Sequence, residues 1–185
     1  MERLLTPPDP PLSSQGFRLR PFPVKDADAV KAAGEDPDIV RYTFMPAAPT
    51  DETTVQWLTR AIEGWHHGMA RFAIVPADAR DDRCAGQIGL VLAKHPAGNA
   101  EAFYWLLPEA RGVSWGAAAL RLVSDWGFES LGVERVGVIV DLDNLASQRT
   151  AEKAGFTREG VLRGYLRTPR RGRVDVWSFS RLASD

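Results

Sequence analysis

One stretch of the sequence constrains the fold more than any other, because three patterns follow one another in it without a break. An aromatic, alternating run at 102–107 is typical of a strand, and an apolar run at 117–131 has helical spacing. Between them lies a turn that contains Gly112 and Gly116. The first N–H groups of a helix lack an intrahelical partner and carry partial positive charge, and glycine lets an anion approach the backbone closely. The stretch therefore predicts a strand, a turn and a helix that together bind a phosphate or pyrophosphate.

The glycine spacing excludes two common nucleotide-binding loops. The turn has no Gly-Lys-Ser/Thr of the ATP/GTP type, and its G-x-x-x-G is not the G-x-G-x-x-G of dinucleotide-binding folds. A dinucleotide-dependent oxidoreductase is still an alternative, because strand, turn, helix and a second strand ending at Asp141 imitate half of such a unit. Too few residues follow Asp141 to supply the other parallel strands, which counts against that alternative.

Three segments carry a resemblance to a known family. The run Arg111-Gly-Val-Ser-Trp-Gly116 resembles the Arg/Gln-x-x-Gly-x-Gly/Ala pyrophosphate loop of the GCN5-related N-acetyltransferases (GNAT). Residues 143–147 and 153–160 are similar to the N-x-x-S…K-x-G-F-x-x-E-G run of the RimJ/RimL-like ribosomal-protein N-terminal acetyltransferases, and 173–179 resembles the last strand of that branch. The likeness covers residues 16–183. The middle glycine of the loop pattern is Ser114 here, which keeps the N–H and adds a hydroxyl at a cost in conformational freedom.

The expected fold class is α/β (α+β layered): a single GNAT-like domain over 16–183, preceded by a Pro-rich N-terminal arm over 1–15. Periodicity and turn residues predict a mixed, mostly antiparallel, twisted sheet of about seven strands flanked by about four helices. The prolines of the arm predict that it forms no hydrogen-bonded element. Strands are expected at 17–22, 72–75, 84–92, 100–107, 133–142, 156–165 and 173–182, and helices at 24–33, 50–64, 117–131 and 146–154.

Composition limits the partners and the compartment. A net charge of −1 gives no reason to expect a nucleic-acid or membrane partner. The one cysteine, Cys84, rules out an internal disulfide and a cysteine-based zinc site, and is more typical of a small strand residue than of a nucleophile. No secretory signal or membrane-length apolar run is present, so we expect a cytoplasmic protein, monomer or homodimer, with no metal.

The resemblance implies an N-acetyltransferase. Acetyl-CoA, or another acyl-CoA, is the implied co-substrate, and a primary amine attacks its thioester directly in a ternary complex. The acceptor is either a protein N-terminal α-amine or a small-molecule amine, and a non-catalytic acyl-CoA-binding module is the alternative. The expected cofactor-binding residues are Leu106, Arg111, Gly112, Val113, Ser114, Trp115, Gly116, Ala117, Asn144, Ser147 and Lys153.

Two residues are the expected catalytic groups. The branch resemblance assigns Ser147 to the departing thiolate, because Ala151 stands where the wider superfamily often has a tyrosine. Glu101 shares a strand face with Phe103 and Trp105 by alternation, which suits a base for the proton of the amine. It also matches the position of the basic glutamate in the histone-acetylating members of the superfamily.

Two further groups of residues have alternative interpretations. His66 and His67 end a predicted helix that borders the acceptor pocket in this superfamily, yet histidines at the end of a helix are also ordinary. The basic cluster at 163–173 can receive an acidic acceptor or be simply solvated; it consists of Arg163, Arg167, Arg170, Arg171 and Arg173.

Overall fold

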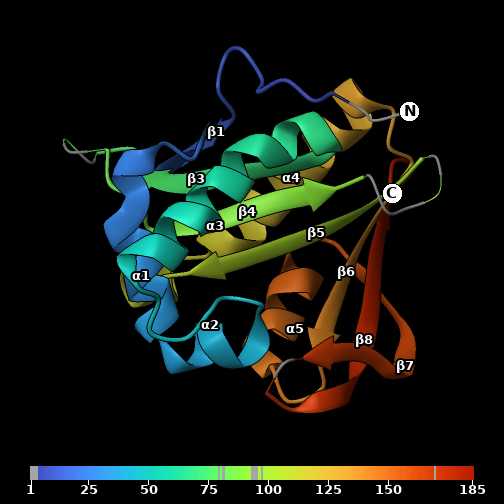
Figure 1. Ribbon diagram of the computed structural model, residues 1–185. Helices are drawn as coiled ribbons and strands as arrows, with labels where there is room; N and C mark the ends of the chain where they lie inside the picture. The colour runs from blue at the N-terminus through green and yellow to red at the C-terminus, as the bar shows by residue number, and fades with distance from the viewer. Residues whose placement is uncertain (1–3, 79, 81, 93–95, 97, 169) are drawn as a thin grey trace.

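The chain folds around one eight-stranded sheet. The computed structural model describes all residues except 1–3, 79, 81, 93–95, 97 and 169. The strand order is β1-β2-β3-β4-β5-β6-β8-β7, and all neighbours are antiparallel except β5 and β6 (Figure 1). The strands are β1 Ser13–Ser14, β2 Phe17–Pro21, β3 Met69–Pro76, β4 Gly86–Val91, β5 Asn99–Leu106, β6 Arg135–Asp141, β7 Thr157–Thr168 and β8 Gly172–Leu182.

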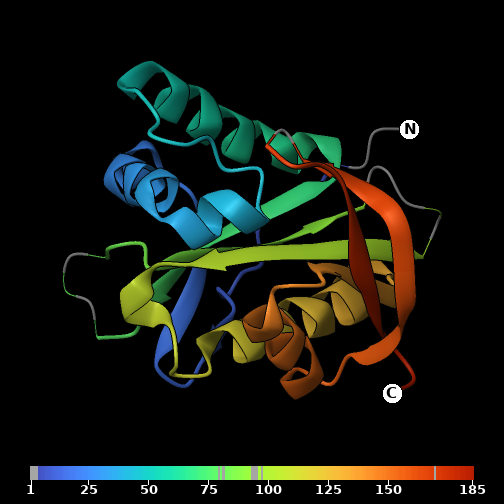
Figure 2. The ribbon, with the colours of Figure 1, turned by 90° about the horizontal axis from the view of Figure 1, so that it is seen from below.

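Helices cover both faces of the sheet. The helices are α1 Ala27–Glu35, α2 Pro37–Tyr42, α3 Asp51–Glu63, α4 Trp115–Leu131 and α5 Leu145–Lys153. Figure 2 shows α1, α2 and α3 on one face and α4 and α5 on the other. Each face has its own apolar cluster, because alternate residues of a strand point to opposite sides. Phe72 and Leu90 pack toward α4, for example, whereas Ala73 and Trp105 pack toward α1 and α3.

The layered α/β fold class and the mixed, mostly antiparallel sheet predicted from the sequence are confirmed by the element order and the strand pairing. All seven predicted strands and four predicted helices are present, with bounds that differ by a few residues. Helix α2 is an addition that the prediction missed. Asp36 starts it by accepting hydrogen bonds from the N–H groups of Asp38 and Ile39, and Pro37 occupies its first turn.

The N-terminal segment differs from the expectation that it forms no hydrogen-bonded element. Ser13 and Ser14 pair with β2 as the short strand β1, across a turn in which Gly16 has φ +87°. Leu5 is only 4% exposed, and its N–H donates to the carbonyl of Trp65 at 2.8 Å. An apolar residue near the start of the chain thus joins the core and holds the proline-rich segment against the domain.

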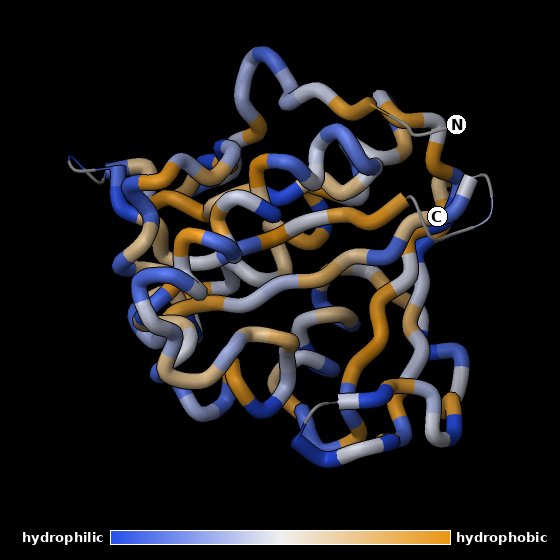
Figure 3. The backbone as a smooth tube through the Cα atoms, viewed as in Figure 1, coloured by the Kyte–Doolittle hydropathy of each residue, from blue (hydrophilic) through white to orange (hydrophobic). Residues whose placement is uncertain are grey.

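Hydropathy follows this architecture. Figure 3 shows hydrophobic segments along the strands inside the molecule and strongly hydrophilic segments at the β7–β8 turn. Among the described residues, no helix combines the length and apolar character needed to cross a bilayer.

Candidate active site

The parallel strands β5 and β6 part soon after they meet. They pair at only three positions, the last of which joins Glu101 to Gly137, whereas β5 stays paired with β4 as far as Leu106 (Figure 1). The N–H of Leu107 donates to Ala85 on the β4 side at 3.0 Å. Because backbone groups alternate in direction along a strand, those of Ala102, Tyr104 and Leu106 point toward the opening. The opening therefore offers a strand edge on which an extended molecule with amide groups can pair.

The turn that follows β5 leads into the start of α4. Gly112 and Ser114 both have positive φ, +79° and +65°, so the serine adopts the left-handed conformation that glycine favours. Ser114 is the N-cap of α4, but its side chain makes no capping hydrogen bond. The first N–H groups of α4 are consequently not satisfied by a cap, and nothing lies within 4 Å of the Cβ position of Gly112. This combination suits an anion, as the sequence predicts.

Gly116 has a different role from the one expected for it. A Cβ at this position would lie 3.2 Å from Cγ2 of Thr150 and 3.3 Å from Cδ1 of Leu106. The missing side chain therefore lets α4 pack closely on α5 and β5. The open space beside Gly112 suits the close approach of an anion.

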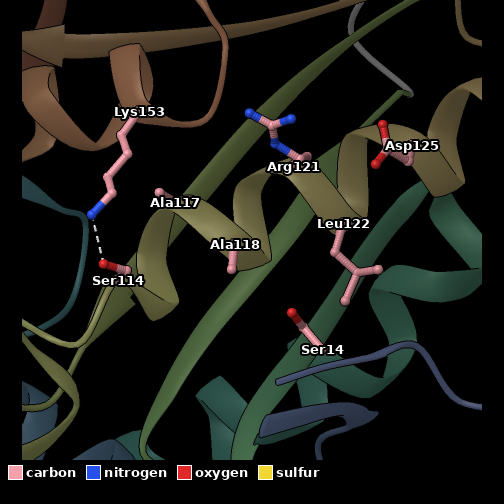
Figure 4. Close-up of a pocket in the computed structure, with 8 residues that line it drawn as sticks. All are labelled: Ser14, Ser114, Ala117, Ala118, Arg121, Leu122, Asp125 and Lys153. Atoms are coloured by element: carbon pink, nitrogen blue, oxygen red, sulfur yellow. Dashed lines mark hydrogen bonds between the residues drawn. The ribbon is translucent and has the colours of Figure 1, made fainter. Parts of the chain in front are cut away.

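Lys153 brings a positive charge to the same turn. Its Nζ donates to Oγ of Ser114 at 2.7 Å, from the last turn of α5. Both residues border a groove of about 320 Å³ along α4 (Figure 4). Asp125 also borders this groove, but its carboxylate is paired with Arg181. The positive charges of Lys153 and Arg121 are therefore available in the groove for an anion. The groove is lined by Ser14, Ser114, Ala117, Ala118, Arg121, Leu122, Asp125 and Lys153.

Two other predicted cofactor-binding residues position the turn with their side chains. Arg111 donates through Nε to the carbonyl of Leu106 at 3.0 Å, and its Nη2 pairs with Asp36 at 2.8 Å. The ring of Trp115 packs on Phe17 with centroids 5.7 Å apart. The side chain of Val113 is exposed at the turn.

The start of α5 places Ser147 beside a residue that the sequence analysis missed. Asn144 is the N-cap, and its Oδ1 accepts a hydrogen bond from the N–H of Ser147 at 3.0 Å. The Oγ of Ser147 lies 2.8 Å from the hydroxyl of Tyr104 on β5. Burial raises the pKa of Tyr104 above its usual value, so the phenol stays protonated at neutral pH. Strand alternation places Tyr104 on the face opposite Phe103, but its contact with Ser147 depends on how α5 packs against β5.

Glu101 lies at the point where β5 and β6 part. It forms the last β5–β6 pair and is half-buried. Alternation puts it on the same face as Trp105, which packs toward α1 and α3, whereas Tyr104 packs toward α4. Glu101 and the Tyr104–Ser147 pair therefore flank the opening from opposite faces of the sheet.

The remaining candidates lie apart from this arrangement. Cys84 is buried, which raises the pKa of its thiol to about 12 and makes it a poor nucleophile. His66 and His67 are exposed at the end of a 3₁₀ turn, and no group of three metal-binding side chains gathers within the described part of the chain.

Two arginines of the basic cluster join the β7–β8 turn to other parts of the chain. Arg170 donates to the carbonyl of Val40 in α2 at 3.0 Å, and Arg171 pairs with Asp141 at the end of β6. Arg171 also lies over the ring of Tyr42, at 5.8 Å from the centroid. These contacts give the two side chains a structural role.

Comparison with known proteins identifies relatives of the chain. A family profile described as "Acetyltransferase (GNAT) domain" matches residues 17–157. The "Uncharacterized N-acetyltransferase YoaA" of Bacillus subtilis (strain 168) is 29% identical over 159 residues, which cover 85% of this chain and 88% of that protein. The "Spermidine N(1)-acetyltransferase" of Escherichia coli (strain K12) is 27% identical over 150 residues, covering 81% of this chain and 77% of that protein.

Solved structures share the fold. The microcin C7 self immunity acetyltransferase MccE, in complex with acetyl-CoA and AMP, matches with a TM-score of 0.79 at 19% identity and covers 94% of this chain and 99% of its own. RimJ of Mycobacterium smegmatis, in complex with CoA-disulfide, matches with a TM-score of 0.74 at 23% identity and covers 91% of this chain and 82% of its own.

Proposed function

The chain belongs to the GNAT acetyltransferase family, and from this premise we propose that its site transfers an acetyl group from acetyl-CoA to a primary amine. The observation that carries the proposal is the parting of β5 and β6 directly beside the uncapped start of α4. One feature suits an extended amide chain and the other a phosphate, and acetyl-CoA contains both. We assign the chain to the RimJ/RimL-like branch within the family, on the motifs at 143–147 and 153–160.

The residues of the turn and of α5 would hold acetyl-CoA. The N–H groups of residues 112–117, the hydroxyl of Ser114 and the ammonium of Lys153 supply donors for its phosphates, and the groove along α4 adds Arg121. The backbone of Tyr104 and the N–H of Leu106 supply a strand edge for its amide arm, while the carbonyl of Leu106 accepts from Arg111. Arg111, Trp115 and Asn144 keep the turn and α5 in place. When bound, acetyl-CoA supplies the acetyl group as a reactive thioester.

Ser147 and Tyr104 act together on the sulfur side of the opening. If the phenol of Tyr104 donates to Oγ of Ser147, the serine proton is free to donate to the departing thiolate. Hydrogen bonds in such a chain strengthen one another, and the raised pKa of Tyr104 keeps its proton in place. Ser147 is thus the catalytic residue and Tyr104 its positioning residue, in a chain that has Ala151 at the usual tyrosine position.

Glu101 acts on the amine side. A carboxylate at the point of parting takes the proton that the attacking amine loses, directly or through water. An α-amine with a pKa of about 8 is about one-tenth neutral at pH 7, whereas a lysine side chain with a pKa of about 10.4 is almost entirely protonated. An α-amine acceptor therefore asks less of this base, and we favour an α-amine, on a protein N-terminus or a small molecule.

The direct test is release of free CoA thiol when the protein, acetyl-CoA and a panel of amines are mixed. The panel contains a peptide with a free N-terminus, the same peptide with a blocked N-terminus and one lysine, and spermidine. Acetylated product, identified by mass, supports the transferase. Tight CoA binding without product from any amine would instead show a non-catalytic acyl-CoA-binding module.

A further inference from the structure

Arg71 occupies an unusual place on the face of the sheet that α1–α3 cover. It pairs with Gly89 on β4, and Gly89 pairs with Phe103 on β5, so the three residues form one row across the sheet. A Cβ on Gly89 would lie 2.5 Å from Cζ of Phe103, so the ring of Phe103 fills the space that glycine leaves. The guanidinium carbon of Arg71 lies 4.9 Å from the centroid of Phe103 and 5.4 Å from that of Trp57 in α3.

The charge of Arg71 lacks a carboxylate partner among the residues that the structure describes. Its Nε is enclosed without a hydrogen bond, while the residue as a whole stays partly exposed. Other enclosed arginines of this fold are paired: Arg20 with Asp26 and Arg181 with Asp125. Burial lowers the pKa of Arg71 to about 10, which still leaves it cationic at neutral pH. A cation without a carboxylate partner in such surroundings has a desolvation cost that its two ring contacts offset only in part, and an apolar side chain at this position would avoid that cost.

The position of Arg71 relative to the opening suggests what this charge is for. Phe103 is the first residue on its face beyond Glu101, where β5 leaves β6. The guanidinium packs directly on Phe103, so it lies one side chain away from the opening, on the same face as the base. An amine that enters from this face meets a carboxylate suited to its proton and a guanidinium suited to an anion.

We propose that Arg71 binds a carboxylate of the acceptor, so that the acceptor is a primary amine that also carries a carboxylate. This inference rests on the proposed acetyl transfer. The planar guanidinium matches a carboxylate with two parallel hydrogen bonds, and its contacts with Phe103 and Trp57 limit the directions in which it can point. The same charge repels a polyamine, so spermidine is expected to be a poor acceptor.

The test compares acceptors that differ only in the carboxylate. An amino acid, a dipeptide and a tripeptide of alanine are each assayed against their C-terminal amides, with spermidine alongside. In at least one pair, the carboxylate is expected to raise kcat/KM about tenfold or more, the size of one charge-assisted contact. If no pair shows this preference, or if spermidine has the highest kcat/KM, the proposal is overturned.

Two variants test whether Arg71 is the source of the preference for a carboxylate. Arg71→Met should reduce the carboxylate preference to about one, leave the KM for acetyl-CoA unchanged, and leave the Tm unchanged or raise it, because an unpaired charge is removed. Arg60→Met removes an exposed arginine from α3 and should change none of these quantities. Retention of the preference by a folded Arg71→Met, or by Arg71→Gln if the first variant does not fold, would overturn the assignment.

Failure of this inference can be told from failure of the proposed function. If amines are acetylated without any carboxylate preference, only the role of Arg71 is wrong. If CoA neither stabilises the protein nor supports acetylation of any amine, the acetyltransferase proposal itself is wrong.

Discussion

At the scale of single residues, the proposed mechanism depends most directly on the hydrogen bond between Tyr104 and Ser147. Ser147→Ala should lower kcat by roughly 10–10³-fold, the range for loss of one donor to a developing charge. The KM for acetyl-CoA should change little, because the phosphate contacts are untouched. Tyr104→Phe should also lower kcat, but should have no further effect in a Ser147→Ala background, because it acts through the serine.

Steady-state kinetics of the two single variants and the double variant measure this coupling. Tyr165→Phe is the matched control, since Tyr165 is 52% exposed on β7. Additive effects of Tyr104→Phe and Ser147→Ala would show that Tyr104 does not work through Ser147.

Glu101 is expected to show a different dependence on pH. In Glu101→Gln the proton of the amine has no base, so the defect in kcat/KM should shrink as the pH rises and more amine is neutral. The defect should also be smaller with a peptide α-amine than with a lysine side chain, because the α-amine has the lower pKa. A pH profile parallel to that of the unmodified enzyme would remove the base role from Glu101.

Part of this proposed site could be predicted from the sequence. Ser147, Ser114 and Lys153 could be chosen from motif spacing, and Glu101 from alternation along its strand. The Lys153–Ser114 bond, the contact of Arg111 with Asp36 and the packing role of Gly116 depend on how α4, α5 and α2 meet. Those distances are set by tertiary packing, on which residue spacing carries no information.

At the scale of elements, a carboxylate on β7 links the last three strands of the sheet. Glu159 pairs with Arg135 on β6 at 2.7 Å and accepts hydrogen bonds from Ser180 and Ser178 on β8. The bond to Arg135, followed by those to the serines, lowers the pKa of Glu159 to about 2 from an ordinary 4.5. Because the folded-state pKa is the lower one, the carboxylate stabilises the fold above pH 4.5, and this contribution is lost as the pH falls toward 2.

Glu159→Gln should therefore lower the Tm at pH 6 and lower it less at pH 3, where the unmodified protein has lost part of this contribution. Thermal melts across this range measure the difference. A constant gap in Tm between the two proteins would show that ionisation of Glu159 does not contribute.

The elements were the most predictable part of the molecule. Apolar periodicity and turn residues gave the seven main strands and four helices. Helix α2 was not predicted because its six residues are too few to show the apolar spacing of a helix. Strand β1 was not predicted because two residues cannot show the alternation of a strand. Both depend on neighbours: α2 is held by Arg111 and Arg170, and β1 lies along β2.

At the scale of the whole molecule, acetyl-CoA and CoA should raise the stability of the fold, because the proposed site joins α4, α5 and β5. A ligand at a hundredfold excess over its Kd adds about 2.7 kcal/mol to the free energy of unfolding. NADPH should not stabilise the protein, since the glycine spacing does not suit a dinucleotide. Thermal shifts with each ligand separate the two cases.

Lys153→Met should weaken CoA binding by about tenfold or more, the scale of one lost charge-assisted contact, and so reduce the thermal shift. Lys31→Met is the control, because Lys31 pairs with Asp51. Equal CoA affinity of the two variants by calorimetry would show that Lys153 is not part of the phosphate site.

The parting of β5 and β6 also affects the tendency of the protein to aggregate. An unpaired strand edge is a template on which any extended chain can grow, which is why proteins cover or blunt their edges. Here the edge lies inside the sheet, and blunting it would close the proposed acetyl-CoA site. Acetyl-CoA bound in the proposed site would cover this edge, so the enzyme should aggregate less on storage as the concentration of acetyl-CoA is raised.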